Sequence, residues 1–346
     1  MAGFSAEDDY FGCPYIAYKK QDYSMDQSIQ MAASHTFESI KRELHKRVIG
    51  QERVVDRLLI ALLADGHILL EGVPGLAKTR TLLALTQVID AQMSRIQFTP
   101  DILPSDVIGT EVYRPQSGDF VIRKGPVFTN LLLADEINRA PAKVQSALLQ
   151  AMQEREVTIG EQTFKLPDPF LVLATQNPIE QEGTYALPEA QVDRFLMKVI
   201  IDYPSFDEEV GIVDLAAKES NSPAPLERVI PLSSLSSLKA QCQQVYSDPK
   251  VDRYIVSLIH ATRAADSYGL KGLIEWGASP RASIALKVCA RAHAFLKGKT
   301  FVTPDDVKEI APDVLRHRVL VTFEAEARGI DSDEVIRTLL ASVAVP

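Results

Sequence analysis

The chain has 346 residues, of which 46% are hydrophobic and 24% are charged, a balance that excludes a disordered or fibrous protein and favours a globular one. Its formal net charge of −9 argues against a general attraction to nucleic acid or to an anionic membrane surface. The three cysteines show neither paired nor metal-ligand spacing, which favours a reducing compartment.

The first 36 residues are polar, with scattered aromatic residues and no sustained period, and are expected to form an arm, either mobile or laid on the surface. The start has acids where a secretory signal needs a basic and then an apolar stretch, and no later run reaches membrane-spanning length. A cytoplasmic location is therefore expected. From Phe37 onward, apolar residues with helical spacing predict two helices, separated by Val48, Ile49, Gly50 and Gln51.

Short apolar runs alternate with helical stretches over residues 37–203. Such runs are typical of buried parallel strands, so the predicted fold class is α/β, with a parallel sheet flanked by helices. The runs cover residues 67–70, 95–98, 131–134, 170–175 and 196–201. A chain of 346 residues commonly forms two domains. Residues 204–346 have helical spacing and few apolar runs of strand type, so they predict a second, smaller α-helical domain. Within it, Thr303, Pro304 and Asp306 form a good helix start.

A glycine-bearing loop follows the first of these runs and leads into a predicted helix. Backbone N–H groups of such a loop, with the positive end of the helix, can surround a polyphosphate. Lys78 can reach the β and γ oxygens, and the hydroxyl of Thr79 can hold Mg²⁺. Ala77 stands where the strict pattern has glycine, which a helical backbone at that position tolerates. The predicted nucleotide contacts are Gly72, Val73, Pro74, Gly75, Leu76, Ala77, Lys78, Thr79 and Arg80. The alternative is a Pro-Gly turn before an amphipathic helix.

Two acids, Asp135 and Glu136, end the apolar run at residues 131–134. A buried parallel strand delivers its last side chains to the edge of the sheet where a phosphate loop also opens. Asp135 would then orient Mg²⁺ and its waters, and Glu136 would polarise an attacking water. Without the other motifs, the same two acids would be an ordinary solvated strand end. Asn177 follows the next predicted strand, and we expect it to lie between the two other strand ends, within reach of the water or the γ-phosphate.

Two arginines are candidates to complete such a site, because phosphoryl transfer gathers negative charge on the γ-phosphate oxygens. Arg194 precedes the last predicted strand, and its alternative role is a salt bridge with Asp193 or Glu189. Arg281 follows Ser279 and Pro280, so its cation falls in the first turn of a helix, where the dipole disfavours it and an anionic partner would relieve the conflict. Arg139 is a weaker candidate.

In this order and spacing, the segments GVPGLAKT, LLLADEINRAP, ATQNP, PEAQVDRF and SPR resemble the AAA+ ATPases of the MoxR family over residues 37 to about 330. The resemblance implies that residues 72–79 form the Walker A loop, that Asp135 and Glu136 are the Walker B acids, and that Asn177 is the sensor 1 residue. It also implies that Arg194 is an arginine finger acting on a neighbour's ATP, that Arg281 is the sensor 2 arginine, and that residues 48–51 lie against adenine.

The same resemblance implies ATP and Mg²⁺ as cofactors, a hexameric ring, a helical lid after the core, and two inserted hairpins, one within residues 98–127 and one at 156–164. It implies a chaperone-like remodeller of a client or adaptor protein, often one with a von Willebrand factor A domain. A DNA-dependent motor and a nucleotide-gated scaffold with little hydrolysis are the alternatives. The net charge argues against the DNA-dependent motor, although Arg123 and Lys124 near the first hairpin could still contact DNA. The presence of Glu136 and Asn177 argues against the scaffold.

Overall fold

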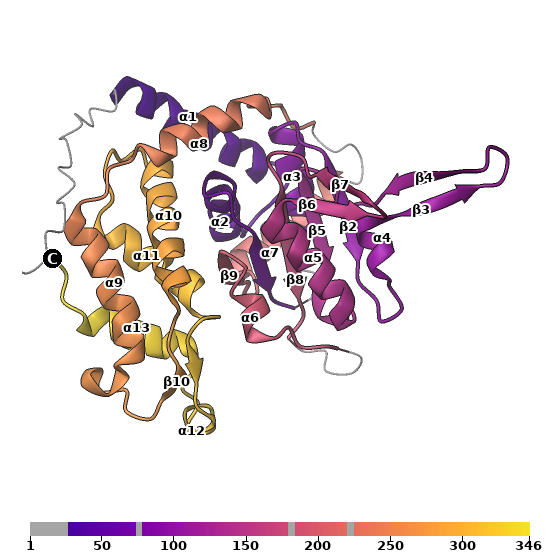
Figure 1. Cartoon of the computed structure of the whole chain (residues 1–346). Helices are drawn as coiled ribbons and strands as arrows, with labels where there is room; N and C mark the ends of the chain where they lie inside the picture. Colours follow the sequence, from indigo (N-terminus) through magenta and orange to yellow (C-terminus); the bar gives the residue numbers. More distant parts are fainter. Residues whose placement is uncertain (1–26, 74–77, 179–183, 220–224) are drawn as a thin grey trace, which may run out of the picture.

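A parallel five-stranded sheet with strand order β2-β5-β8-β1-β9 forms the centre of the protein (Figure 1). The computed structural model describes residues 27–73, 78–178, 184–219 and 225–346. The strands are β1 (Ile68–Glu71), β2 (Met93–Gln97), β5 (Leu131–Asp135), β8 (Leu171–Gln176) and β9 (Met197–Ile200). Each of the five apolar runs is therefore a strand, as the sequence predicts.

Alternate residues of each strand enter different hydrophobic cores, because successive side chains of a strand point to opposite faces of the sheet. Ile68 and Leu70 join the core that holds α1 (Gln27–His45), α2 (Glu52–Leu63) and α3 (Lys78–Val88), and Leu69 joins the core that holds α5 (Ala142–Glu154). Both faces of the sheet are thus covered, which explains why its strands are apolar throughout rather than alternating with polar residues.

Helix α1 begins at Gln27, whereas the sequence predicts helical structure only from Phe37 and an arm over residues 1–36. Ala33, Phe37, Ile40 and Leu44 are all buried, so the apolar stripe of this helix extends N-terminal to Phe37. The expectation for residues 27–36 is therefore corrected, and residues 1–26 lie outside the described part of the chain.

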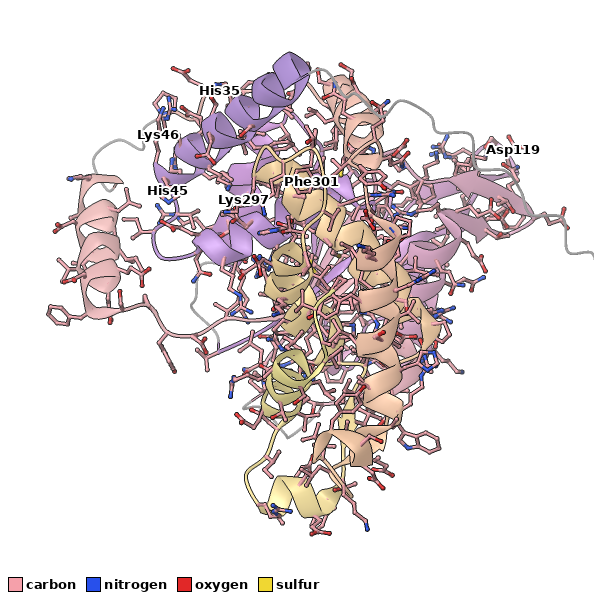
Figure 2. All side chains as sticks on the ribbon, turned by 90° about the vertical axis from the view of Figure 1, so that its left-hand side faces the viewer. His35, His45, Lys46, Asp119, Lys297 and Phe301 are labelled. Atoms are coloured by element: carbon pink, nitrogen blue, oxygen red, sulfur yellow. The ribbon has the colours of Figure 1, made fainter. Side chains whose placement is uncertain are left out.

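Both predicted hairpins are present. The first, β3 (Gly109–Arg114) and β4 (Asp119–Lys124), follows the short helix α4 (Pro104–Ile108) and projects away from the body in Figure 1. Asp119 accordingly lies on the opposite side of the molecule from His45 in Figure 2. The second hairpin, β6 (Glu156–Ile159) with β7 (Gln162–Lys165), connects α5 to the segment before β8. The ammonium of Lys124 lies 4.8 Å from the ring centroids of both Phe128 and Phe164, which fixes the base of the first hairpin against the second.

The C-terminal part is helical, as predicted. Its helices are α7 (Phe206–Glu219), α8 (Ser233–Gln243), α9 (Pro249–Arg263), α10 (Pro280–Leu296), α11 (Pro304–Leu315), α12 (Phe323–Ala327) and α13 (Ser332–Ser342), with the 3-10 turn η2 (Ala265–Tyr268). The predicted capping box of α11 forms between Thr303 and Asp306. A small antiparallel pair, β10 (Ile274–Trp276) with β11 (Leu320–Val321), was not expected. Strands of two and three residues are too short to carry a period-2 pattern.

Side chains at the end of α11 bind the backbone that enters β9. Arg316 donates to the Lys198 carbonyl at 2.8 Å, and the Nε2 atom of His317 lies 3.2 Å from the Phe195 carbonyl. Arg318 donates to the same Phe195 carbonyl at 2.6 Å. All three side chains are buried, so this junction joins the helical domain firmly to the sheet.

Among the described residues, none of the helices combines the length and the apolarity that crossing a membrane requires.

The carboxylate of Asp313 on α11 is a second link between the two parts of the chain. It is fully buried and accepts hydrogen bonds from Arg57 at 2.7 Å, from Arg53 at 2.7 Å and from Arg316 at 2.6 Å. Arg57 is itself buried, and it lies on α2 of the sheet domain. Removing the carboxylate would leave this buried guanidinium with the exposed Glu309 as its remaining anionic partner.

We expect Asp313→Asn to lower the free energy of unfolding by about 3–5 kcal/mol, because one member of a buried ionic network is removed. Chemical denaturation of purified protein measures this change. Glu309→Gln is the matched control, because Glu309 binds the same Arg57 at 3.0 Å but is 57% exposed. The control should lose less than about 1 kcal/mol. Equal losses in the two variants would contradict the importance assigned to burial.

His67, directly before β1, is buried and holds three elements together. Its Nδ1 atom accepts the Val172 N–H at 3.0 Å, so its Nε2 atom carries the proton and donates to the Met152 carbonyl at 3.0 Å. Burial lowers the pKa of His67 from 6.5 to about 3, with a smaller contribution from Arg155. The folded protein therefore keeps this ring neutral at pH values where the unfolded chain protonates it.

This histidine predicts a pH-dependent stability. Below pH 6.5 the unfolded chain binds a proton that the folded chain does not bind until about pH 3, so stability falls as pH falls through this window. The contribution of one such group approaches about 1.4 kcal/mol per pH unit. His67→Asn should show a shallower decline of the free energy of unfolding between pH 6 and pH 4.5 than the wild-type protein. An identical slope in the two proteins would contradict the role of His67.

Candidate active site

The glycine-bearing loop leaves the sheet at the C-terminal end of β1, as predicted. Gly72 passes close to β9, and a Cβ atom there would lie 2.8 Å from the Ile201 carbonyl oxygen, so only glycine fits without a shift of the backbone. Gly72 and Val73 are described, and α3 starts at Lys78. The predicted contacts at Pro74, Gly75, Leu76 and Ala77 lie outside the described residues.

Lys78, Thr79 and Arg80 form the first turn of α3, the end of the helix at which the dipole favours an anion. The Lys78 ammonium donates a hydrogen bond to the Gly72 carbonyl. Burial lowers the pKa of Lys78, and the charges of Asp135, Glu71 and Glu136 oppose this shift. These opposing charges show that the ammonium shares one electrostatic environment with both predicted acids, although they lie far apart in the sequence.

Asp135 ends β5, and Thr175 on the neighbouring strand β8 holds it. The Thr175 hydroxyl donates to the Asp135 carboxylate at 2.6 Å and accepts the Glu136 N–H at 2.9 Å. Thr175 is not among the site residues predicted from the sequence. The available signal was a hydroxyl-bearing residue at the end of an otherwise apolar strand, in a sheet whose parallel strands end at the same edge.

Glu136 has a left-handed backbone conformation with φ 57°. For a residue with a Cβ atom this conformation costs about 1–2 kcal/mol, so surrounding contacts must maintain it. Its carboxylate accepts hydrogen bonds from the Gln97 amide at 2.8 Å and forms an ion pair with Arg139 at 3.0 Å. Arg139, the weaker arginine candidate, is thus a partner of Glu136.

Two residues of β2 also approach the acids, and neither was predicted as a site residue. Gln97 pairs with Asp135 in the strand ladder, which brings its amide beside Glu136. Arg95 donates to the second oxygen of Asp135 at 2.7 Å. The signal for both lies in strand register, which a single sequence does not reveal.

Asn177 follows β8 directly, and β8 lies between β5 and β1 in the sheet. The predicted position between the other two strand ends is therefore observed. Asn177 is buried, and its backbone carbonyl lies 3.5 Å from the side-chain nitrogen of Asn138.

The Asp193 carboxylate, next to Arg194 in the sequence, lies between Arg318 and the candidate Arg281. Asp193 accepts a hydrogen bond from the buried Arg318 at 2.6 Å, and its other oxygen lies 3.9 Å from the Arg281 guanidinium. Arg281 is in the first turn of α10 and therefore has the anionic neighbour that its position predicts. Arg194 is exposed and, within the described ranges, forms no ion pair, so its alternative role as a partner of Asp193 or Glu189 is not observed.

The segment formed by Val48, Ile49, Gly50 and Gln51 lies between α1 and α2, as predicted, and meets α7. A Cβ atom at Gly50, whose φ is +72°, would lie 3.0 Å from the Glu208 carboxyl carbon. A Cβ atom at Gly211 would lie 3.3 Å from Ile49. The glycines at positions 50 and 211 thus allow this segment and α7 to approach closely.

The donors at this edge of the sheet suit a nucleotide-bound magnesium ion. Mg²⁺ in such sites takes oxygen ligands from one or two protein groups and from phosphates and water. Thr79 at the start of α3 offers a hydroxyl and Asp135 a carboxylate. No group of three or more His, Cys, Asp or Glu side chains arranged for a metal occurs among the described residues.

Models of known families match two parts of the chain. Residues 67–197 match "ATPase family associated with various cellular activities (AAA)", which covers the loop, both acids, Asn177 and Arg194. Residues 270–339 match "AAA lid domain", which covers Arg281.

Several known proteins are similar over nearly their whole length. Chaperone MoxR1 of Mycobacterium tuberculosis is 46% identical over 318 residues, which cover 91% of this chain and 84% of that protein. Protein MoxR of Methylorubrum extorquens is 30% identical, with 88% and 94% covered. A crystal structure from Cytophaga hutchinsonii superposes with a TM-score of 0.86 at 45% identity, with 92% of this chain and 98% of that chain covered.

Proposed function

Because the chain belongs to the MoxR family of AAA+ ATPases, we propose that it binds ATP with Mg²⁺ at the C-terminal edge of its parallel sheet and hydrolyses it to remodel partner proteins. The proposal rests on the position of three groups at this edge: Lys78 is bound to Gly72 directly after β1, and Asp135 and Glu136 lie at the end of β5 in the same parallel sheet. The fold agrees with membership, since a helical lid domain follows the parallel-sheet core.

Each residue has a proposed task within one subunit. The first turn of α3 binds the phosphates through its N–H groups, and Lys78 neutralises the β and γ oxygens. Thr79 and Asp135 hold the metal, which supplies Lewis-acid stabilisation of the phosphate charge. Glu136 accepts the proton of the attacking water, and Asn177 orients that water. Residues 48–51 and α7 enclose the base.

We propose that a second subunit completes the site. Arg194 is exposed on the same chain that carries the loop, and an exposed guanidinium with no ion pair among the described residues is available to a neighbour's γ-phosphate. The family resemblance implies a hexameric ring, in which every subunit both receives and supplies such an arginine. Arg281 would contact phosphate from the lid.

The proposed target is protein rather than nucleic acid. MoxR1 is named a chaperone, and the family resemblance suggests a client or adaptor, which includes proteins with a von Willebrand factor A domain. The DNA-motor alternative has little support, since the ammonium of Lys124 already lies against two aromatic rings and the net charge is −9. The scaffold alternative is not favoured either.

ATP turnover as a function of protein concentration tests the proposal. Turnover per subunit should rise with concentration and then reach a plateau, because the site needs a second copy of the chain. It should require Mg²⁺, which EDTA removes. Constant turnover per subunit across the range in which size-exclusion chromatography shows monomers becoming oligomers would contradict the shared site.

A further inference from the structure

A continuous chain of hydrogen bonds joins the two acids through the edge strand β2. One nitrogen of Arg95 donates to Asp135 at 2.7 Å and to the side-chain oxygen of Gln97 at 3.1 Å. The amide nitrogen of Gln97 donates to Glu136 at 2.8 Å. The metal-binding acid and the catalytic acid are thus linked through two side chains that have no assigned role.

The direction of every bond in this chain follows from chemistry. A guanidinium can only donate, and a carboxylate can only accept. Gln97 must therefore present its oxygen to Arg95 and its amide nitrogen to Glu136, the orientation that the structure has. If Arg95 moves away, the side-chain oxygen of Gln97 loses its hydrogen-bond donor. The Arg95 bond then no longer fixes the orientation in which the Gln97 amide nitrogen faces Glu136.

Arg95 is able to move, whereas Asp135 is held in place. β2 is an edge strand with β5 as its neighbour in the sheet, and the Arg95 side chain is 51% exposed. Asp135 is 16% exposed, and Thr175 binds its other oxygen at 2.6 Å. An exposed guanidinium can exchange its partner for water at low cost.

We propose that Arg95 and a divalent cation are alternative partners of Asp135, so that metal binding displaces Arg95 and thereby loosens the hold of Gln97 on Glu136. This inference rests on the proposed function, because it takes Asp135 as a metal residue. Two positive groups cannot share one carboxylate oxygen without repulsion, and the dication interacts more strongly with it. Arg95 is on this view a positioning residue that makes release of the catalytic acid depend on the metal.

Titration with Mn²⁺, followed by the EPR signal of the free ion, tests the competition in full-length protein saturated with ADP. Arg95→Ala should bind Mn²⁺ about two- to five-fold more tightly than the wild type, the range expected for losing an exposed competing ion pair. Affinity for ADP without metal should be unchanged, a separation that a general structural defect would not produce. Arg95→Gln serves if the alanine variant does not fold.

Two further variants serve as controls, one that keeps the positive charge of Arg95 and one that removes an arginine elsewhere. Arg95→Lys keeps the positive charge and should bind Mn²⁺ within about two-fold of the wild type. Arg114→Ala removes an exposed arginine of β3 and should have no effect. Unchanged or weaker Mn²⁺ binding by Arg95→Ala, in protein that binds ADP normally, would overturn the role of Arg95 alone. A wild-type protein that binds no ADP would instead overturn the proposed nucleotide site.

Discussion

Replacing Arg194 by alanine should lower ATP turnover by about 10³- to 10⁵-fold, the range that a trans-acting arginine contributes to phosphoryl transfer. Nucleotide binding to the same subunit should remain, because Arg194 is exposed and forms no ion pair with any described residue of its own chain. Steady-state turnover and equilibrium ADP binding, measured side by side, give the two values. Arg123→Ala, which changes another exposed arginine, is the matched control.

Mixing variants tests whether the arginine acts on a neighbour. A subunit with Arg194→Ala keeps its own Glu136, and a subunit with Glu136→Gln keeps its own Arg194. In a mixed oligomer, some interfaces combine the intact acid of one subunit with the intact arginine of the other, and turnover should return. Two inactive variants that stay inactive after mixing under conditions of subunit exchange would contradict action in trans, as would full activity of Arg194→Ala alone.

Glu136→Gln should keep ATP and Mg²⁺ bound while slowing hydrolysis by about 10²- to 10⁴-fold, the usual contribution of a positioned general base. Glutamine has nearly the same shape and can still accept hydrogen bonds from Gln97 and Arg139 through its oxygen, but it cannot take a proton from water. Single-turnover hydrolysis and binding of a fluorescent ATP analogue measure the two effects separately. Glu161→Gln, in the exposed turn between β6 and β7, should behave as the wild type.

The core of the fold could be predicted because its strands are buried on both faces. Runs such as residues 131–134 are apolar without interruption and end in polar residues, so both the strand and the chemistry at its end are visible in the sequence. The glycine-bearing loop and the acids were found in this way. The second hairpin was predictable because its residues alternate around a short turn, whereas the first was implied by the family resemblance.

The contacts between strands could not be predicted in the same way. Thr175, Gln97 and Arg95 are ordinary strand residues until the ladder brings β2 and β8 to either side of β5. The start of α1 was missed because most residues before Phe37 are polar, so the apolar stripe of the helix is hard to recognise there. A buried residue in this part is Ala33, whose small side chain gives a weak hydrophobic signal. The Asp313 network was missed because its partners Arg53 and Arg57 are some 260 positions earlier in the sequence.

The junction between α11 and β9 has a mechanical consequence. Arg318 is bonded both to the Asp193 carboxylate and to the Asp193 carbonyl, and the next residue along the chain is Arg194. If the helical domain tilts when nucleotide binds or leaves, Asp193 must follow it, and Arg194 must follow Asp193. In the proposed oligomer, each subunit would then signal the occupancy of its own nucleotide site to its neighbour by moving the Arg194 guanidinium, which would allow the sites to act in sequence.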